Sequence, residues 1–188
     1  AHVNSVTCFS RCHHGWSYHD TKVGARHPHL VRNLLPKMIE ACHARGINVP
    51  VYVTVGWDER SAREHPEWME RRRDGSPNGA GPFEAGWRKL CLNTPYLDFV
   101  TAYTGEVVRS FDLDGLFMDI VWQEHCRCPR CLEGMKAVGL DPENEDDCEI
   151  FAGRVLENYY ERLNGMAWSI KPGLRIFHNK GNADKGRR

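Results

Sequence analysis

Apolar residues follow two alternating patterns along the chain. Short runs rich in Val, Ile and aromatic residues predict strands, and they cover residues 3–10, 49–55, 116–121 and 174–177. Apolar residues spaced three and four apart predict helices in the intervals, within residues 34–42, 99–108 and 150–166. Because this alternation of strand and helix is typical of βαβ units, we predict a parallel sheet.

The third predicted strand contains one carboxylate. Residues 116–121 are apolar except for Asp119. A lone charged group in such a run is costly to bury unless it has a partner or a function. Asp119 is therefore either a structural group bonded to a neighbouring strand or a catalytic carboxylate at the end of its own strand.

Polar and aromatic residues follow every predicted strand. Functional groups at the carboxyl ends of successive parallel strands are typical of a (β/α)₈ barrel. No glycine-rich phosphate-binding motif follows any strand, which argues against a doubly wound nucleotide-binding fold. The residues at the four strand ends are His13, His14 and Trp16; Trp57, Asp58 and Glu59; Asp119, Trp122 and Glu124; and His178 and Asn179.

The predicted fold class is therefore α/β, a partial (β/α)₈ TIM barrel of about four β/α units. A whole barrel takes about 250 residues, and this chain has 188, so we expect a fragment. We assign residues 1–181 to a partial TIM-barrel catalytic domain and residues 182–188 to a disordered tail. The irregular segment 60–92, which contains Trp68, Phe83 and Trp87, is either a substrate-covering loop or a folded surface insertion.

The amino-acid composition argues against nucleic-acid and membrane partners. The chain carries 25 basic and 25 acidic residues, and this balance argues against nucleic acid as a partner. No apolar stretch approaches the roughly 20 residues that a membrane span needs, so we expect no membrane partner. We favour a cytoplasmic location, although no motif fixes the compartment, and the oligomeric state stays open.

Three of the eight cysteines lie in one short motif, Cys126-x-Cys128-x2-Cys131. Thiols clustered this closely favour a metal site over a disulfide scaffold. A structural zinc site usually has four tetrahedral ligands, so a fourth ligand is needed, and Cys91 and His125 are the candidates. An unmetallated reduced cluster and a disulfide of the Cys126–Cys131 type are the alternatives.

Several segments resemble, in chain order, the catalytic domain of α-L-fucosidases. They are His13-His14-Gly15-Trp16, the helix within 33–47, the Tyr-containing strand at 51–53 and the strand 114–119. The resemblance implies that Asp119 is the nucleophile and that His13 and His14 contact sugar hydroxyls. It also places Trp57 near the sugar. We assign Trp16, Tyr52 and Asp58, which lie in or beside these segments, to substrate binding as well. The chain has His-His-Gly-Trp where that family has His-His-Asp-Gly-Phe.

The segment that starts at Leu90 resembles family-42 β-galactosidases. Cys91 precedes Asn93-Thr94-Pro95, and a helix, a strand and the CxCxxC motif follow. In many of those enzymes, a Cys before an Asn-Ser-Pro turn binds zinc together with such a motif. The resemblance implies a structural zinc and no organic cofactor. Its ligands would be Cys91, Cys126, Cys128 and Cys131, a closed site that joins the loop after the Asp119 strand to the preceding helix.

As a whole, residues 3–180 resemble a group of uncharacterised glycosyl hydrolases with a Cys-His-His-Gly loop and a Cys-x-Cys-Pro-x-Cys cluster. We therefore expect a retaining glycosidase that cleaves O-glycosyl bonds of an oligosaccharide or glycoconjugate. Retention needs a second carboxylate about 5 to 5.5 Å from the nucleophile; Asp58, Glu59 and Glu124 are candidates, and a fragment without it would be inactive. The alternatives are a non-catalytic carbohydrate-binding barrel fragment and a metal-dependent hydrolase that uses His13, His14 and a carboxylate.

Overall fold

The computed structural model describes residues 2–81 and 83–180. The tail predicted at residues 182–188 lies outside the described residues. None of the described helices has the length and apolar character of a membrane span. In chain order, the described elements are β1 (Cys8–Arg11), α1 (Leu34–His43), β2 (Pro50–Thr54), α2 (Glu59–Glu64), the 3-10 turn η1 (Pro66–Trp68), α3 (Tyr96–Ser110), β3 (Gly115–Asp119), α4 (Pro129–Ala137), α5 (Glu145–Ile170) and β4 (Ile176–His178).

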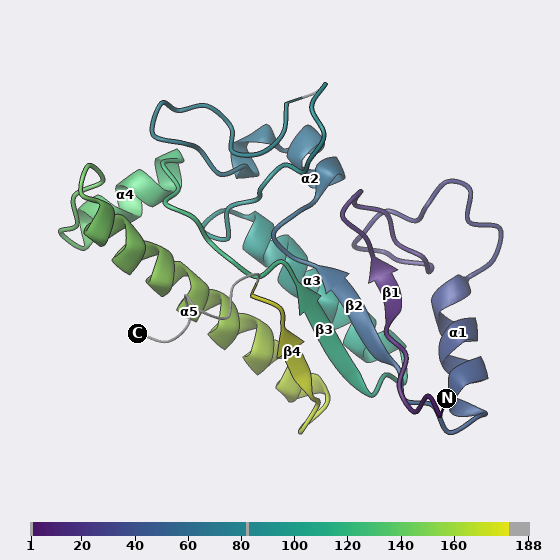
Figure 1. Ribbon diagram of the computed structural model, residues 1–188. Helices are drawn as coiled ribbons and strands as arrows, with labels where there is room; N and C mark the ends of the chain where they lie inside the picture. The colour runs from purple at the N-terminus through teal and green to yellow at the C-terminus, as the bar shows by residue number, and fades with distance from the viewer. Residues whose placement is uncertain (1, 82, 181–188) are drawn as a thin grey trace.

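The described strands form one parallel sheet in the order β1-β2-β3-β4 (Figure 1). Parallel neighbours need crossover connections, and α1, α3 and α5 lie in these connections. The carboxyl ends of the strands point towards the side that carries α2 and the loops around it (Figure 1). The predicted α/β class and partial barrel of about four β/α units are confirmed.

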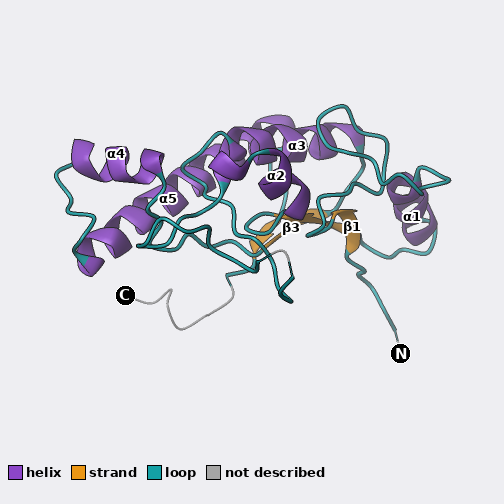
Figure 2. Cartoon of the chain, turned by 90° about the horizontal axis from the view of Figure 1, so that it is seen from above, coloured by secondary structure: helices purple, strands orange, loops and turns teal. Residues whose placement is uncertain are grey.

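α1, α3 and α5 lie on one face of the sheet and bury one side of each central strand (Figure 2). Val51 and Val53 of β2 and Leu116 and Met118 of β3 are at most 1% exposed. They belong to the main hydrophobic core, together with residues of α3 and α5. Because side chains alternate across a strand, the intervening residues point to the opposite face.

A row of aromatic rings lies on that opposite face. Phe9, Tyr52, Phe117 and Phe177 occupy matching positions on successive strands. Their ring centroids are 4.2, 5.7 and 5.0 Å apart along the row. In a closed barrel this face points inward, where the side chains of further strands would cover it. Asp119 follows Phe117 by two residues, so it lies on the inner face at the carboxyl edge of the sheet.

The starts of β1 and α5 differ from the sequence prediction. β1 begins at Cys8 and not at Val3, because only an isolated bridge between Ser5 and Asn48 precedes it. The acidic residues 145–147, outside the predicted apolar pattern, form the first turn of α5. Asn144 caps that helix, and the negative charges meet the positive end of the helix dipole.

β3 ends at Asp119 because Ile120 adopts a left-handed backbone conformation, with φ of 60°. A β-branched residue is strained there, and such an outlier persists only where its surroundings hold it. The Gly56 amide donates to the Ile120 carbonyl at 2.9 Å. A Cβ added to Gly56 would lie 2.4 Å from the same oxygen. The turn that fixes the end of β3 therefore requires glycine at position 56.

A buried ion pair joins the carboxyl end of β1 to the start of α2. Arg11 and Asp58 are 2% and 0% exposed, and Arg11 Nε donates to Asp58 Oδ2 at 3.1 Å. Asp58 also caps α2 by accepting a hydrogen bond from the Ser61 amide at 2.9 Å. Protein groups occupy the Asp58 carboxylate and cover it completely, which argues against the predicted contact of Asp58 with substrate.

We expect Asp58→Ala to lower the free energy of unfolding by about 3–5 kcal/mol, since it leaves the Arg11 charge buried without its partner. Chemical denaturation measures the change. The exposed pair Lys37–Glu40 provides the control, and Glu40→Ala should produce no measurable change. Equal losses in the two variants would contradict the role given to the buried pair.

Gly56→Ala tests the turn after Asp119, and Gly153→Ala is its control. The two substitutions should change the free energy of unfolding in opposite directions. The methyl group at position 56 meets the Ile120 carbonyl and should destabilise the protein by about 1–3 kcal/mol. Gly153 in α5 has open space around its Cβ position, so Ala should stabilise that helix by about 0.5–1 kcal/mol. Stabilisation by Gly56→Ala in the same denaturation assay would disprove the close approach.

Candidate active site and metal site

Asp119 lies at the centre of a hydrogen-bonded group formed by the strand ends. The Tyr52 hydroxyl of β2 donates to Asp119 Oδ2 at 2.5 Å, and the side-chain amide of Asn179, after β4, donates to Oδ1 at 2.6 Å. His13, after β1, places Nε2 3.8 Å from Oδ2. Asp119 is only 9% exposed. Each carboxylate oxygen thus has a donor, which offsets the cost of burying the charge.

His13 is oriented by Thr54. The Thr54 hydroxyl donates to the Trp57 carbonyl at 2.7 Å, so it accepts a hydrogen bond from His13 Nδ1 at 2.7 Å. Burial lowers the pKa of His13, although the nearby Asp119 carboxylate acts in the opposite direction. The imidazole is therefore neutral near pH 7, and Nε2 presents a lone pair beside Asp119.

Tyr52 donates a hydrogen bond that positions Asp119. Burial, followed by the hydrogen bond to Asp119, raises the pKa of Tyr52, so its hydroxyl stays protonated. Its ring stacks between Phe9 and Phe117 in the aromatic row, which fixes the direction of the hydroxyl. The structure thus shows Tyr52 bound to Asp119, and its predicted contact with substrate stays a prediction.

Three tryptophans form an aromatic wall beside the two histidines. The His13 ring lies 5.1 Å from Trp57 and 5.1 Å from Trp87, and the His14 ring lies 4.9 Å from Trp87. Trp122, after β3, lies 5.5 Å from Trp57. Trp87 and Trp122 are absent from the site predicted by sequence. Trp122 follows a strand end, but Trp87 belongs to an irregular segment, and its one sequence signal is an aromatic residue in a long loop.

The other predicted site residues lie elsewhere or bind protein groups. Trp16 contacts the ring of His27 at 5.9 Å, and the Arg60 guanidinium lies 4.9 Å above its ring. None of these contacts brings Trp16 to Asp119. The candidates for a second carboxylate form ion pairs with cations: Asp58 with Arg11, Glu59 with Arg88 and Glu124 with Lys89.

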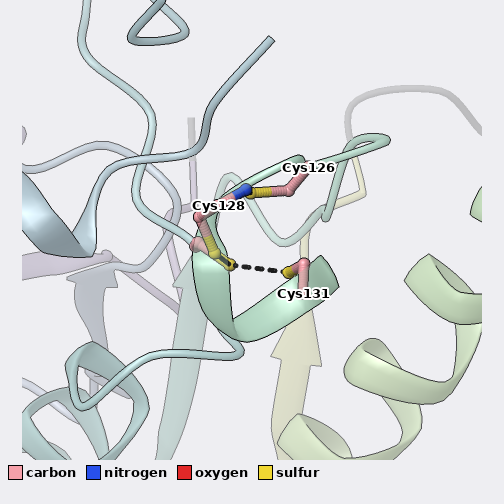
Figure 3. A group of neighbouring side chains, drawn as sticks. Cys126, Cys128 and Cys131 are labelled. Carbon is pink, nitrogen blue, oxygen red and sulfur yellow. Dashed lines mark hydrogen bonds between the residues drawn. The ribbon is translucent and has the colours of Figure 1, made fainter. Parts of the chain in front are cut away.

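A second group, separate from Asp119, consists of four buried cysteines. The sulfur atoms of Cys91, Cys126, Cys128 and Cys131 all lie within 4.8 Å of one another. Cys91 Sγ is 3.5 Å from Cys131 Sγ and 3.8 Å from Cys128 Sγ. Four thiolates around a tetrahedral zinc would be about 3.8 Å apart. Figure 3 shows Cys126, Cys128 and Cys131 converging from the loop before α4 and from its first turn.

Backbone and side-chain N–H groups point at these sulfur atoms, as thiolate ligands require. Hydrogen bonds among the four thiols lower the pKa of Cys128 and raise the pKa of Cys91 and of Cys131. In the described part of the chain, this is the one group with three or more metal-ligating side chains, and it could hold a metal ion. The N–H donors are Asn93 and Gln123 to Cys91, Arg71 and Cys128 to Cys126, and Asn93 to Cys131.

The structure also bears on two alternatives for the cysteine group, namely His125 as its fourth member and a Cys126–Cys131 disulfide. Both ring nitrogens of His125 form hydrogen bonds that carboxylates accept, Nδ1 to Glu145 at 2.6 Å and Nε2 to Glu149 at 2.8 Å. It therefore lies outside the sulfur cluster, and Cys91 is the fourth member. Every described cysteine is free, so the structure contains no Cys126–Cys131 disulfide.

The comparisons with known proteins agree with this arrangement. Residues 1–120 match the family described as hypothetical glycosyl hydrolase 6. A search of curated proteins gives no match. Among solved structures, α-L-fucosidase isoenzyme 2 from Paenibacillus thiaminolyticus is 45% identical, with a TM-score of 0.94. That match covers 99% of this chain but only 28% of the Paenibacillus enzyme.

More distant structures share the fold at low sequence identity. The β-galactosidase from Bacillus circulans sp. alkalophilus is 13% identical, with a TM-score of 0.68, over 94% of this chain and 32% of its own. The PgaB glycoside hydrolase domain from Bordetella bronchiseptica is 12% identical, with a TM-score of 0.68, over 94% of this chain and 55% of its own. Because the family match spans residues 1–120 of the 188, the chain belongs to the hypothetical glycosyl hydrolase 6 family.

Proposed function

We propose that the protein is a retaining glycoside hydrolase that cleaves O-glycosyl bonds of an oligosaccharide or glycoconjugate, with Asp119 as its nucleophile. The placement of Asp119 carries the proposal. It is a buried carboxylate at the carboxyl end of β3, held by Tyr52 and Asn179 and adjacent to His13. Catalytic groups of (β/α)₈ enzymes lie at this edge. The family and the 45% identical fucosidase support the same class of reaction.

In the first step, an oxygen of Asp119 attacks the anomeric carbon while the glycosidic bond breaks. The leaving oxygen takes a proton from a carboxylic acid, and the sugar remains as an ester on Asp119. The second carboxyl group, now ionised, then deprotonates a water that attacks the anomeric carbon and releases the sugar with retained configuration. Tyr52 and Asn179 hold the two oxygens of the nucleophile in fixed positions for both steps.

His13, His14 and Trp57 are the proposed sugar contacts. His13 Nε2, which lies 3.2 Å from the Tyr52 hydroxyl, can accept a hydrogen bond from a sugar hydroxyl beside Asp119. His14 is exposed on the same loop, and Trp57 offers an apolar ring at the His13 edge. The Paenibacillus enzyme is an α-L-fucosidase, which makes α-L-fucosides the first substrates to test.

Glycan binding without hydrolysis is the second candidate function. One observation favours it, namely that Asp58, Glu59 and Glu124 all form ion pairs with cations. A protein that kept the sugar site without an acid would bind glycans and leave them intact. A metal-dependent hydrolase has less support, because among described residues His13 and His14 are not in a group of three metal-ligating side chains.

We also propose that the four-cysteine group holds a structural zinc. Four thiolates complete the tetrahedral coordination of zinc and leave no open position for a substrate, so the ion would stabilise the fold. It would join the loop before α3 to the first turn of α4. Gln123 lies four residues after Asp119 and contacts the segment that carries Cys91. Its side chain donates to Cys91 Sγ and accepts a hydrogen bond from the Leu92 amide at 2.9 Å.

Asp119→Asn in the full-length gene product should lower kcat on p-nitrophenyl α-L-fucoside by about a thousandfold or more, because the amide cannot form the ester intermediate. Asp112→Asn, an exposed carboxylate just before β3, is the matched control and should keep wild-type turnover. Near-normal turnover by Asp119→Asn would disprove the nucleophile. Glycan binding without turnover in the wild-type protein, across aryl glycosides of the common sugars, would favour the second candidate function.

The purified wild-type protein should contain about one zinc per chain, and Cys91→Ser should lose it and melt at a lower temperature. Elemental analysis and thermal melting provide the two readouts. Cys148→Ser is the matched control, since Cys148 is buried but lies outside the sulfur cluster. Full zinc content in Cys91→Ser would contradict the assignment of the fourth ligand.

A further inference from the structure

Residues 69–81 and 83–91 belong to a long loop that carries Trp87 to the aromatic wall. Both ends of the loop are held by buried contacts. Near its start, Glu70 is 1% exposed, and its carboxylate accepts from the Glu124 amide at 2.9 Å and from the Asn78 side chain at 3.0 Å. At its end, the Cys91 amide donates to the Trp68 carbonyl at 2.8 Å. The loop is thus tied to η1 and to the segment after β3.

The residues next to Trp87 are fixed even more tightly. The Arg88 amide and Arg88 Nε each donate to the Glu59 carboxylate at 2.7 Å. Lys89 pairs with Trp57 in an isolated bridge, and the Leu90 amide donates to the Gly56 carbonyl at 3.0 Å. Because Glu59 begins α2, Trp87 is anchored to a helix and to the end of β2. The loop is therefore a preformed wall of the site and not a lid that must close.

His13 lies between Asp119 and Trp87. His13 contacts both groups, with Nε2 3.8 Å from Asp119 and its ring 5.1 Å from Trp87. The exposed His14 lies beside Trp87 at 4.9 Å. An indole ring next to a hydrogen-bonding imidazole matches the two faces of a sugar, whose C–H groups pack on aromatic rings and whose hydroxyls need polar partners.

We propose that Trp87 stacks on the sugar unit next to the one whose bond Asp119 breaks, so that the loop selects a glycan chain over a simple glycoside. This inference rests on the proposed glycosidase function and extends it from the reacting sugar to its neighbour. A rigid loop suits this role, because a preorganised aromatic ring loses little conformational entropy when the glycan binds.

The test compares Trp87→Ala, Trp87→Phe and Phe83→Ala in the full-length gene product. Phe83 lies in the same loop and is fully exposed, so Phe83→Ala controls for a general effect on the loop. Each variant is assayed for hydrolysis of fucosyllactose and of α-L-fucosyl fluoride, which has no group at the position next to the reacting sugar. Calorimetric binding of fucosyllactose is measured in the Asp119→Asn background, where the trisaccharide is not consumed. Thermal melting reports whether each variant is folded.

Trp87→Ala should lower kcat/KM at least about tenfold more on fucosyllactose than on α-L-fucosyl fluoride, and it should weaken fucosyllactose binding by a similar factor. Trp87→Phe keeps a ring and should recover most of the loss, while Phe83→Ala should match the wild type. Equal losses on both substrates, or none, with the fold intact would overturn the role of Trp87. Loss of fucosyllactose binding in Trp87→Ala without hydrolysis by the wild type would uphold Trp87 and overturn the proposed function. Absence of both binding and hydrolysis in the wild type would overturn both.

Discussion

Burial of the Asp119 carboxylate is the constraint on which the site depends. An ionised group that is only 9% exposed needs hydrogen-bond donors for both of its oxygens. The parallel register provides them: Thr54 of β2 pairs with Asp119, and Tyr52 lies two residues earlier on the same face. Asn179 reaches the other oxygen from the segment after β4. Three strands must therefore be in register for the carboxylate to remain buried, so the fold and the candidate site depend on each other.

The sequence predicts much of this arrangement because strand periodicity determines which residues lie at the carboxyl edge. His13, Trp57 and Asp119 follow from the ends of apolar runs, and the structure brings them together. Asp58 also follows a strand end, but its partner Arg11 is 47 residues away. No local pattern shows that the two side chains pair in the core. The left-handed conformation of Ile120 cannot be predicted from the local sequence either, because it depends on the absence of a side chain at Gly56.

Loop residues are the hardest to place from sequence. Trp87 occupies no periodic segment, and its position depends on Glu59, Glu70 and hydrogen bonds to η1 that join distant parts of the chain. The cysteine cluster shows the opposite case. The spacing of Cys126, Cys128 and Cys131 predicts a metal site directly, because metal ligands in one turn leave a local signature. A resemblance implies Cys91 as the fourth member, and the structure places Cys91, not His125, in the sulfur cluster.

If Asp119 is the nucleophile that we propose, it becomes covalently bound to the sugar during turnover. A fluorinated, activated α-L-fucoside slows the second step and lets the intermediate accumulate on the nucleophile. The full-length gene product would be incubated with this reagent, digested and analysed by mass spectrometry. A glycosyl adduct on the peptide that contains Asp119, absent from Asp119→Asn, is the predicted result. An adduct on a different carboxylate, in a protein that turns over the substrate, would contradict the account.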